Sequence, residues 1–255
     1  MRTKLALISF LSSVAFGQMT STRFDGENLI VTFGSQGRYL GAAIKGAPYS
    51  AEQSIEHVQT LADGTHIKQP NNGQKMWRDS EGRTRTERPM NYGMQADAPT
   101  FAVVEIRDPV AGFSYVLDDT NKIAHRVALA PPPAPRQRTA TTATRPASVN
   151  SLSGPEKLGS KNIEGVIAEG TRFSNTIPIG AQGNDRPMTT TNESWFSQEL
   201  KAMVLSVFSD PRNGETTTRL FNISRSEPDP SLFMPPADYT VVDEKDSFTI
   251  TIKKQ

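Results

Sequence analysis

Short stretches in which apolar and polar residues alternate dominate the pattern along this chain. The clearest apolar stripes with this spacing are Phe113, Tyr115, Leu117 and Phe248, Ile250, Ile252. A spacing of two places side chains on one face of an extended strand. These stretches therefore predict β-strands that bury one face.

Turn-forming residues divide the first half into hairpins. Asp63-Gly64 stands between predicted strands at 54–60 and 65–69, and this dipeptide suits a two-residue type I′ turn. Between predicted strands at 74–78 and 83–88, Asp79 opens a turn and Gly82 closes it in the left-handed conformation. We therefore expect a meander of about six strands up to residue 129.

The second half continues in the same way. Strands are predicted at 162–175, 188–196, 203–209, 215–226 and 248–253. Residues 200–208 also fit a helix, but Val204, Val207 and the turn at Asp210 favour a strand. Asp229 followed by Pro230 is typical of a capped helix start, so residues 230–233 are predicted to form a single turn. The predicted fold class is mainly all-β and antiparallel, with few short helical turns.

The N-terminus has the features of a secretory signal. Arg2 and Lys4 precede a short apolar stretch at 5–16, and Ala15 and Gly17 are small residues suited to cleavage after Gly17. The alternative, a membrane anchor, needs about 20 apolar residues. The chain contains no cysteine, which excludes disulfides and a lipid anchor on cysteine. We expect residues 1–17 to be removed and the mature protein to be periplasmic or secreted.

Composition divides the remaining chain into three parts. A β region at 18–129 is followed by a Pro-rich segment at 130–155 and a second β region at 156–255, and both β regions could share one sheet. The Pro-rich segment is predicted to be a linker or loop, with a Pro-rich recognition peptide as the alternative. Loss of Arg2 and Lys4 leaves 26 of the 28 basic residues against 27 acidic ones. This balance favours neither nucleic acid nor an anionic membrane as a partner.

Candidate catalytic chemistry is sparse. On a two-residue turn, His57 and His66 would lie roughly 13 Å apart, too far to share a metal ion, and His125 belongs to another strand. The nucleophile, zinc and phosphate-loop motifs are absent from the sequence. We predict no catalytic residue, no metal and no cofactor, although carboxylates paired across distant strands stay open as a route to hydrolysis.

The strand after Gly82 carries charge on both faces. Arg83, Arg85 and Glu87 share one face of it, and Thr84, Thr86 and Arg88 the other. This pattern predicts an exposed or edge strand. It is interpreted either as an anion-binding ridge or as an edge that resists aggregation.

Several motifs together carry a resemblance to known proteins. They are Gln59-Thr60-Leu61-Ala62-Asp63-Gly64-Thr65, Trp77-Arg78-Asp79-Ser80-Glu81-Gly82-Arg83-Thr84-Arg85, Glu193-Ser194-Trp195, Asp210-Pro211-Arg212 and Pro228-Asp229-Pro230-Ser231-Leu232-Phe233. This set resembles a group of uncharacterised exported bacterial proteins. More distantly, it is similar to LolA-like lipoprotein carriers and RseB-like sigma-factor regulators, which are half-barrels. That second resemblance implies a curved antiparallel sheet or incomplete β-barrel around an apolar cavity. The helices that plug such cavities are not evident here, and the Pro-rich segment departs from the pattern.

These expectations together define a function. We expect a soluble, exported, non-catalytic protein that binds an apolar or amphiphilic ligand, or an envelope protein as partner, in a curved β-sheet. The expected ligand-binding residues are Phe113, Tyr115, Leu117, Trp195, Arg83 and Arg85. The alternatives are a secreted hydrolase that uses carboxylates, or a structural surface protein without a ligand.

Overall fold

The computed structural model describes residues 19–25, 28–34, 41–69, 73–91, 100–131, 151–152 and 154–253. The predicted signal peptide at 1–17 and most of the predicted Pro-rich linker lie outside these residues. The described part contains 17 β-strands and one 3-10 helix, η1 (Pro230–Phe233). None of its helices is long and apolar enough to cross a membrane. The mainly all-β fold class is confirmed.

The strands form two sheets. The smaller one has the order β1-β2-β17, with bounds β1 (Met19–Asp25), β2 (Asn28–Phe33) and β17 (Phe248–Lys253). The larger one follows the path β10 (Ser151–Leu152), β12 (Val166–Ile177), β13 (Met188–Ser197), β14 (Ala202–Asp210), β15 (Gly214–Ser224), β3 (Tyr49–Thr60), β5 (Gln74–Arg78), β6 (Thr84–Asn91), β7 (Thr100–Asp108), β8 (Phe113–Asp118), β9 (Ile123–Ala128), β16 (Thr240–Asp243). Off this path, β11 (Glu156–Ile163) pairs with β12, and β4 (His66–Lys68) pairs with β3.

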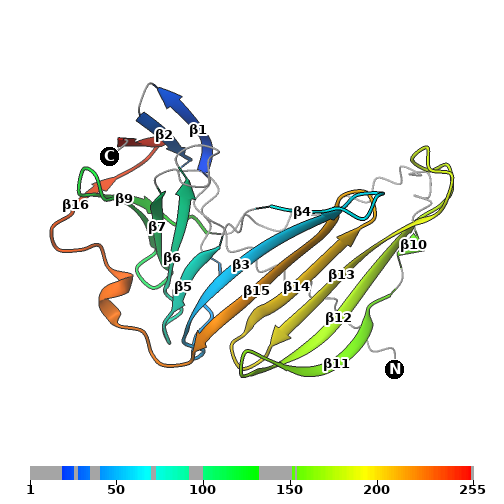
Figure 1. Cartoon of the computed structure of the whole chain (residues 1–255). Helices are drawn as coiled ribbons and strands as arrows, with labels where there is room; N and C mark the ends of the chain where they lie inside the picture. The colour runs from blue at the N-terminus through cyan, green and yellow to red at the C-terminus, as the bar shows by residue number, and fades with distance from the viewer. Residues whose placement is uncertain are drawn as a thin grey trace, which may run out of the picture.

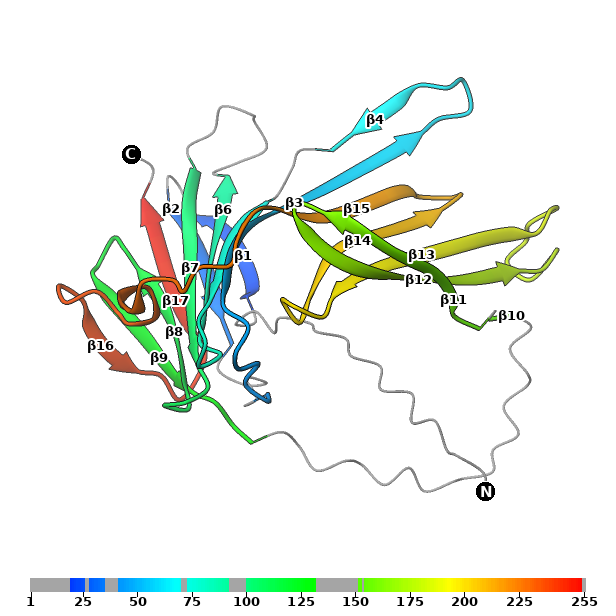
Figure 2. The same cartoon turned by 90° about the horizontal axis from the view of Figure 1, so that it is seen from below.

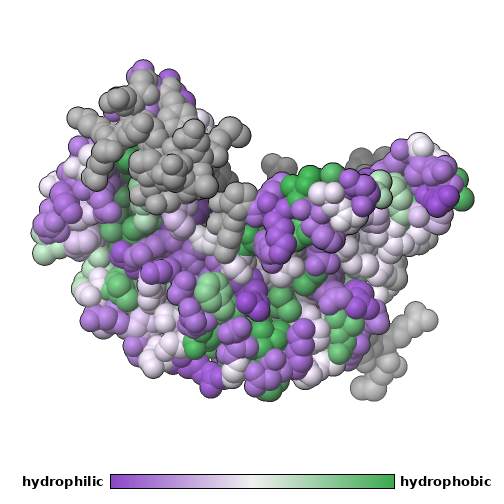
Figure 3. All heavy atoms as spheres, in the orientation of Figure 1, coloured by the Kyte–Doolittle hydropathy of each residue, from purple (hydrophilic) through white to green (hydrophobic). Residues whose placement is uncertain are grey.

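The large sheet is bent into two wings (Figure 1). Strands β3, β4 and β10 to β15 spread to one side as the open wing, whereas β5 to β9 and β16 form the covered wing beside the three-stranded sheet (Figures 1 and 2). The two ends of the path, β10 and β16, are not paired, so the sheet is curved without closing into a barrel. The space-filling view shows hydrophobic and hydrophilic residues interspersed on the face of the two wings that is turned to the viewer (Figure 3).

Strand β3 joins the two wings. It lies between β15 and β5, so strands from both predicted β regions share one sheet. Its first residues, from Tyr49 to Gln53, pair with β5, and its last, from Val58 to Thr60, pair with β4. Among the described strands of the large sheet, every pairing is antiparallel except that of β16 with β9.

The hairpin at Gly64 differs from its prediction in the turn. Leu61 N donates to Thr65 O at 2.8 Å, and Gly64 N donates to Leu61 O at 2.9 Å. The turn is therefore longer than two residues, and His66 pairs with Thr60 instead of Leu61. Asp63 accounts for the difference, because its carboxylate accepts from Thr65 N and stabilises the wider loop.

The hairpin at Gly82 is confirmed. Gly82 has a φ of +86°, and Gly82 N donates to Asp79 O at 3.1 Å. The Asp79 carboxylate also accepts from Arg83 N at 2.8 Å. A Cβ at Gly82 would stand 3.0 Å from the Cβ of Ala43 and from the backbone N of Ile44. Glycine is therefore required here both by conformation and by space.

The covered wing has a core on each face. On one face, Phe248 and Ile250 of β17 pack against Val116 and Val127. On the other face, Phe233 of η1, 1% exposed, packs against a cluster that also contains Ile106, Leu117 and Ala124. The two apolar stripes predicted from sequence thus lie on opposite faces of the sheet. Phe248 and Ile250 cover the first face, whereas Leu117 belongs to the second.

Three other local predictions have clear outcomes. Asp229 Oδ1 accepts from Ser231 N, so the predicted cap and the single turn of η1 are confirmed. Residues 203–209 lie in β14 and form a strand, not a helix. The single strand predicted at 162–175 is wrong, because Glu164 and Gly165 both adopt positive φ and turn β11 into β12.

Candidate functional site

Arg83 and Arg85 were predicted to lie on an exposed or edge strand, and this is wrong. Strand β6 lies between β5 and β7 in the interior of the sheet. Arg83 Nε contacts Asp79 Oδ2 at 2.5 Å, and Arg85 Nη2 contacts Glu87 Oε1 at 2.7 Å. The charges on this strand and its turn thus neutralise each other, which explains how an interior strand can carry them.

The predicted apolar site residues belong to packed regions. The Phe113 ring lies under the Arg126 guanidinium, 4.7 Å from its centroid, and Leu117 is 5% exposed. Tyr115 packs on the same core as Leu117. Trp195 is buried, and Lys161 Nζ stands 4.0 Å from its ring centroid. The six predicted residues are therefore not brought together in one pocket.

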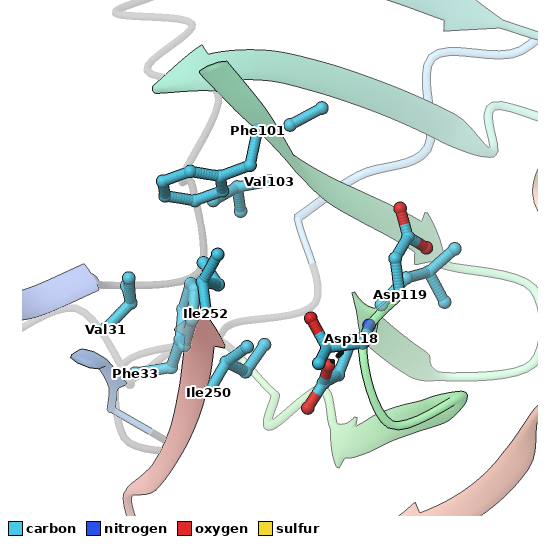
Figure 4. A pocket seen from close by; sticks show the side chains of 11 residues that line it. Val31, Phe33, Phe101, Val103, Asp118, Asp119, Ile250 and Ile252 are labelled. Carbon is cyan, nitrogen blue, oxygen red and sulfur yellow. Dashed lines mark hydrogen bonds between the residues drawn. The ribbon is translucent and has the colours of Figure 1, made fainter. Parts of the chain in front are cut away.

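A small cavity lies between the two sheets (Figure 4). Its volume is about 150 Å³, and its apolar lining residues are Val31, Phe33, Phe101, Ala102, Val103, Leu117, Ile250 and Ile252. Asp118 and Asp119 line one side of it (Figure 4), and Thr120 also belongs to its lining. The Asp118 carboxylate accepts from Thr120 N and Asn121 N, and Asp119 accepts from Tyr239 Oη. Pockets for small molecules usually measure roughly 300 to 1,000 Å³, so this space is small for an acyl chain.

The open wing offers a much wider surface. Antiparallel partners point to the same face of a sheet, so the register identifies rows of neighbouring side chains. One row is Phe173, Asn192, Phe208, Thr216, His57, and the next is Thr171, Ser194, Ser206, Thr218, Ile55. Alternation along β3 places both rows on the face of the sheet that carries Ala51. Successive cross-strand partners lead from Ala51 through Met76 to Val116, so Val116 of the covered wing lies on this same face. It is thus the face that the three-stranded sheet covers in the other wing.

The ten residues of these two rows form what we call the uncharged face. They include no Asp, Glu, Lys or Arg. Phe173 is 42% exposed, Phe208 43% and Ile55 36%. Ile67 of β4, 43% exposed, pairs with Gln59 and so extends this face at the edge of the wing. Large apolar groups therefore stay in contact with solvent on a patch whose ten residues carry no charge, and Glu169 and Asp210 border it on the same side of β12 and β14.

The opposite face of the same strands is charged. Arg172 Nη2 contacts Glu193 Oε1 at 2.5 Å, and Arg172 Nη1 contacts Glu156 Oε2 at 3.2 Å. Lys68 and Glu56 form a further pair at 3.6 Å. The hydrogen bonds and charge of Glu193 raise the pKa of Arg172 above its ordinary value. The two faces of the open wing thus differ sharply in charge.

Most polar groups on the uncharged face are available for hydrogen bonds. His57 Nδ1 and Thr216 Oγ1 lie 2.9 Å apart. Within the described residues, the Asn192 carboxamide makes no side-chain hydrogen bond, and neither do the hydroxyl groups of the second row, those of Thr171, Ser194, Ser206 and Thr218. Together with the exposed phenyl rings, these groups can meet a ligand that has both apolar and hydrogen-bonding surfaces.

The histidines do not form a common site. His66 Nδ1 lies 3.1 Å from Thr60 Oγ1, and His125 Nδ1 lies 2.7 Å from Glu244 Oε1. His57 instead contacts Thr216. In the described ranges, no three His, Asp or Glu side chains are grouped so that they could hold a metal ion.

Comparison with known proteins gives distant structural matches. No model of a protein family matches the chain, and no curated protein matches it. A chain from the Pseudomonas aeruginosa MucA/MucB complex matches with 13% identity and a TM-score of 0.37, over 76% of this chain and 58% of that one. LprF from Mycobacterium bovis matches with 11% identity and a TM-score of 0.30, over 72% of this chain and 90% of LprF. A LolA superfamily protein from Nitrosomonas europaea matches with 7% identity and a TM-score of 0.29, over 75% and 92%.

These matches agree with the predicted distant resemblance to LolA-like and RseB-like proteins. The chain spans only 58% of the matched chain in the MucA/MucB complex. With identities of 7 to 13% and TM-scores below 0.4, no ligand or partner can be transferred to this chain.

Proposed function

We propose that this protein is an exported, non-catalytic binding protein, periplasmic or secreted, that holds an uncharged amphiphilic ligand on the uncharged face of the open wing. The observation that carries the proposal is the difference between the two faces. A sheet face left to water normally carries charged and polar side chains, as the face with Arg172 and Glu193 does. Exposed apolar groups gathered on one uncharged face are typical of contact surfaces.

The position of this face supports the same proposal. On the covered wing, the equivalent face is filled by the three-stranded sheet, where Phe248 and Ile250 bury it. On the open wing, Phe173 and Phe208 occupy equivalent surface without such cover from a described element. A ligand that packs on these rings would remove their apolar area from water, at roughly 25 cal/mol per Å².

Binding is favoured over hydrolysis for a specific reason. A glycosidase or similar hydrolase needs two carboxylates directed at the substrate. Three acidic residues of the charged face are held in ion pairs, Glu156 and Glu193 with Arg172 and Glu56 with Lys68. The uncharged face itself contains no acid.

The proposal is tested by titrating a fluorescent hydrophobic probe into the protein and into two matched variants. Phe208→Glu places a charge on the uncharged face, whereas Val207→Glu places it on the opposite face of the same strand. We expect a saturable signal for the wild type and for Val207→Glu, and its loss in Phe208→Glu. Circular dichroism and thermal melts verify that both variants are folded. A wild type without saturable signal, or equal binding by both variants, would refute the proposal.

A further inference from the structure

We propose that the ligand of the uncharged face is a neutral glycan, a linear chain of hydroxyl-bearing sugar rings that lies across the strands of the open wing. This inference rests on the proposed function and names the chemical class of the ligand. It is argued from the spacing of the aromatic rings, from the hydrogen-bonding groups around them and from the absence of charge.

The two exposed phenyl rings have a regular spacing. Phe173 on β12 and Phe208 on β14 stand in the same cross-strand row, with Asn192 of β13 between them. Neighbouring strands lie about 4.8 Å apart, so the two rings are separated by roughly 10 Å. This is close to the length of two linked sugar rings. The C–H faces of alternate sugars in a linear chain can therefore stack on Phe173 and Phe208, which are both more than 40% exposed.

Hydrogen-bonding groups surround the aromatic row. The Asn192 carboxamide can both donate and accept between the two rings, and the neighbouring row supplies hydroxyl groups from Thr171, Ser194, Ser206 and Thr218. Sugar hydroxyls also donate and accept. A glycan bound here would therefore form hydrogen bonds that satisfy both its own hydroxyl groups and the polar side chains of the protein.

Other ligand classes fit these groups less well. A bare acyl chain would cover Asn192 and the hydroxyl row without giving them partners, and burying an unsatisfied polar group is unfavourable. A charged glycan or an anionic head group would find no Lys or Arg on the uncharged face. A neutral hydroxylated chain is the class that matches both the rings and the polar groups.

The test uses linear neutral hexasaccharides of glucose and of N-acetylglucosamine as probes, with binding measured by isothermal titration calorimetry. We expect at least one of them to bind the wild type. We expect Phe173→Ala and Phe208→Ala each to weaken binding about two- to twelvefold, because each variant loses one stacking ring. Thr191→Ala and Val207→Ala, on the charged face, are the matched controls and should bind as the wild type does. The affinity should not change with salt, since no charge takes part.

The outcomes separate this inference from the proposed function. If neither hexasaccharide binds while the hydrophobic probe still requires Phe208, the glycan is overturned and the proposed function stands. If neither kind of probe binds the wild type, both fail. Binding of a hexasaccharide that is insensitive to Phe173→Ala and Phe208→Ala would place it elsewhere on the protein and overturn the glycan proposal.

Discussion

Two glycines with the same backbone conformation allow strain and crowding to be measured separately. Gly64 and Gly82 both have a φ of +86°, and each closes a hairpin turn. A Cβ at Gly64 would meet nothing within 4 Å. A Cβ at Gly82 would lie 3.0 Å from the Cβ of Ala43 and 3.0 Å from the N of Ile44. Alanine at either position pays for the left-handed conformation, but only at Gly82 does it also collide with a neighbouring segment.

The expected magnitudes follow from this difference. The left-handed conformation costs an alanine roughly 1 to 2 kcal/mol, and this should be the whole effect of Gly64→Ala. Overpacking against a neighbouring backbone adds roughly 1 to 3 kcal/mol in Gly82→Ala. For a chain of this length, about 1 kcal/mol shifts Tm by about 2 to 4 °C. Gly82→Ala should therefore melt about 2 to 12 °C below Gly64→Ala.

The measurement is a pair of thermal melts followed by circular dichroism at equal protein concentration and scan rate. A urea titration gives the same comparison as a shift in midpoint. If the two variants melt at the same temperature, Gly82 is not crowded by Ala43 and Ile44, and the packing of that segment on the hairpin is wrong.

Three further predictions concern other parts of the molecule. Hydrogen bonds from Arg212 lower the pKa of Asp210 from 3.8 to about 2. The stability that the Asp210 carboxylate contributes is therefore present above about pH 4 and is lost as the pH falls through about 2. Melts of Asp210→Asn should depend less on pH over that range than wild-type melts do. Arg78 is buried and donates hydrogen bonds to the carbonyl oxygens of Ala47 and Leu200. Arg78→Met should therefore lower the free energy of unfolding by about 2 kcal/mol or more in urea titrations, and an unchanged midpoint would contradict this. Protein recovered from an exporting host should begin after Gly17 in a mass spectrum, and an intact N-terminus would exclude the predicted cleavage.

Local features of this fold could be predicted from the sequence because they depend on nearby residues. Alternation located the strand at Phe113 and the one at Phe248, and turn chemistry identified the hairpin at Gly82 and the cap at Asp229. The turn at Gly64 was mispredicted in length, because the Asp63 carboxylate stabilises a loop wider than the dipeptide suggests.

Which strands become neighbours across long stretches of sequence could not be predicted, since pairing between distant segments leaves little local signal. Arg83 and Arg85 suggested an edge strand because the sequence does not show that Asp79 and Glu87 neutralise them in the interior. The uncharged face was missed for the same reason. In β13, β15 and β3 the charged side chains lie on one parity only, whereas β12 carries Glu169 and Arg172 on opposite parities. These parities align into a face only when the register of five strands is known.

The pairing of β2 with β17 has a consequence for how the chain folds. Leu29, Val31 and Phe33 are buried together with Phe248 and Ile250, more than 200 residues further along the chain, and β3 cannot complete its pairing until β15 exists. Contacts between such distant segments must wait for long loops to close, so folding should be slow and should reach completion only after the last strand has been synthesised. A chain of this topology is expected to stay unfolded for longer than a protein whose strands pair only with their sequence neighbours. During that time chaperones can bind it and it can cross a membrane in the unfolded state. Removing β17 should trap it in that state, with the apolar side of β2 left exposed.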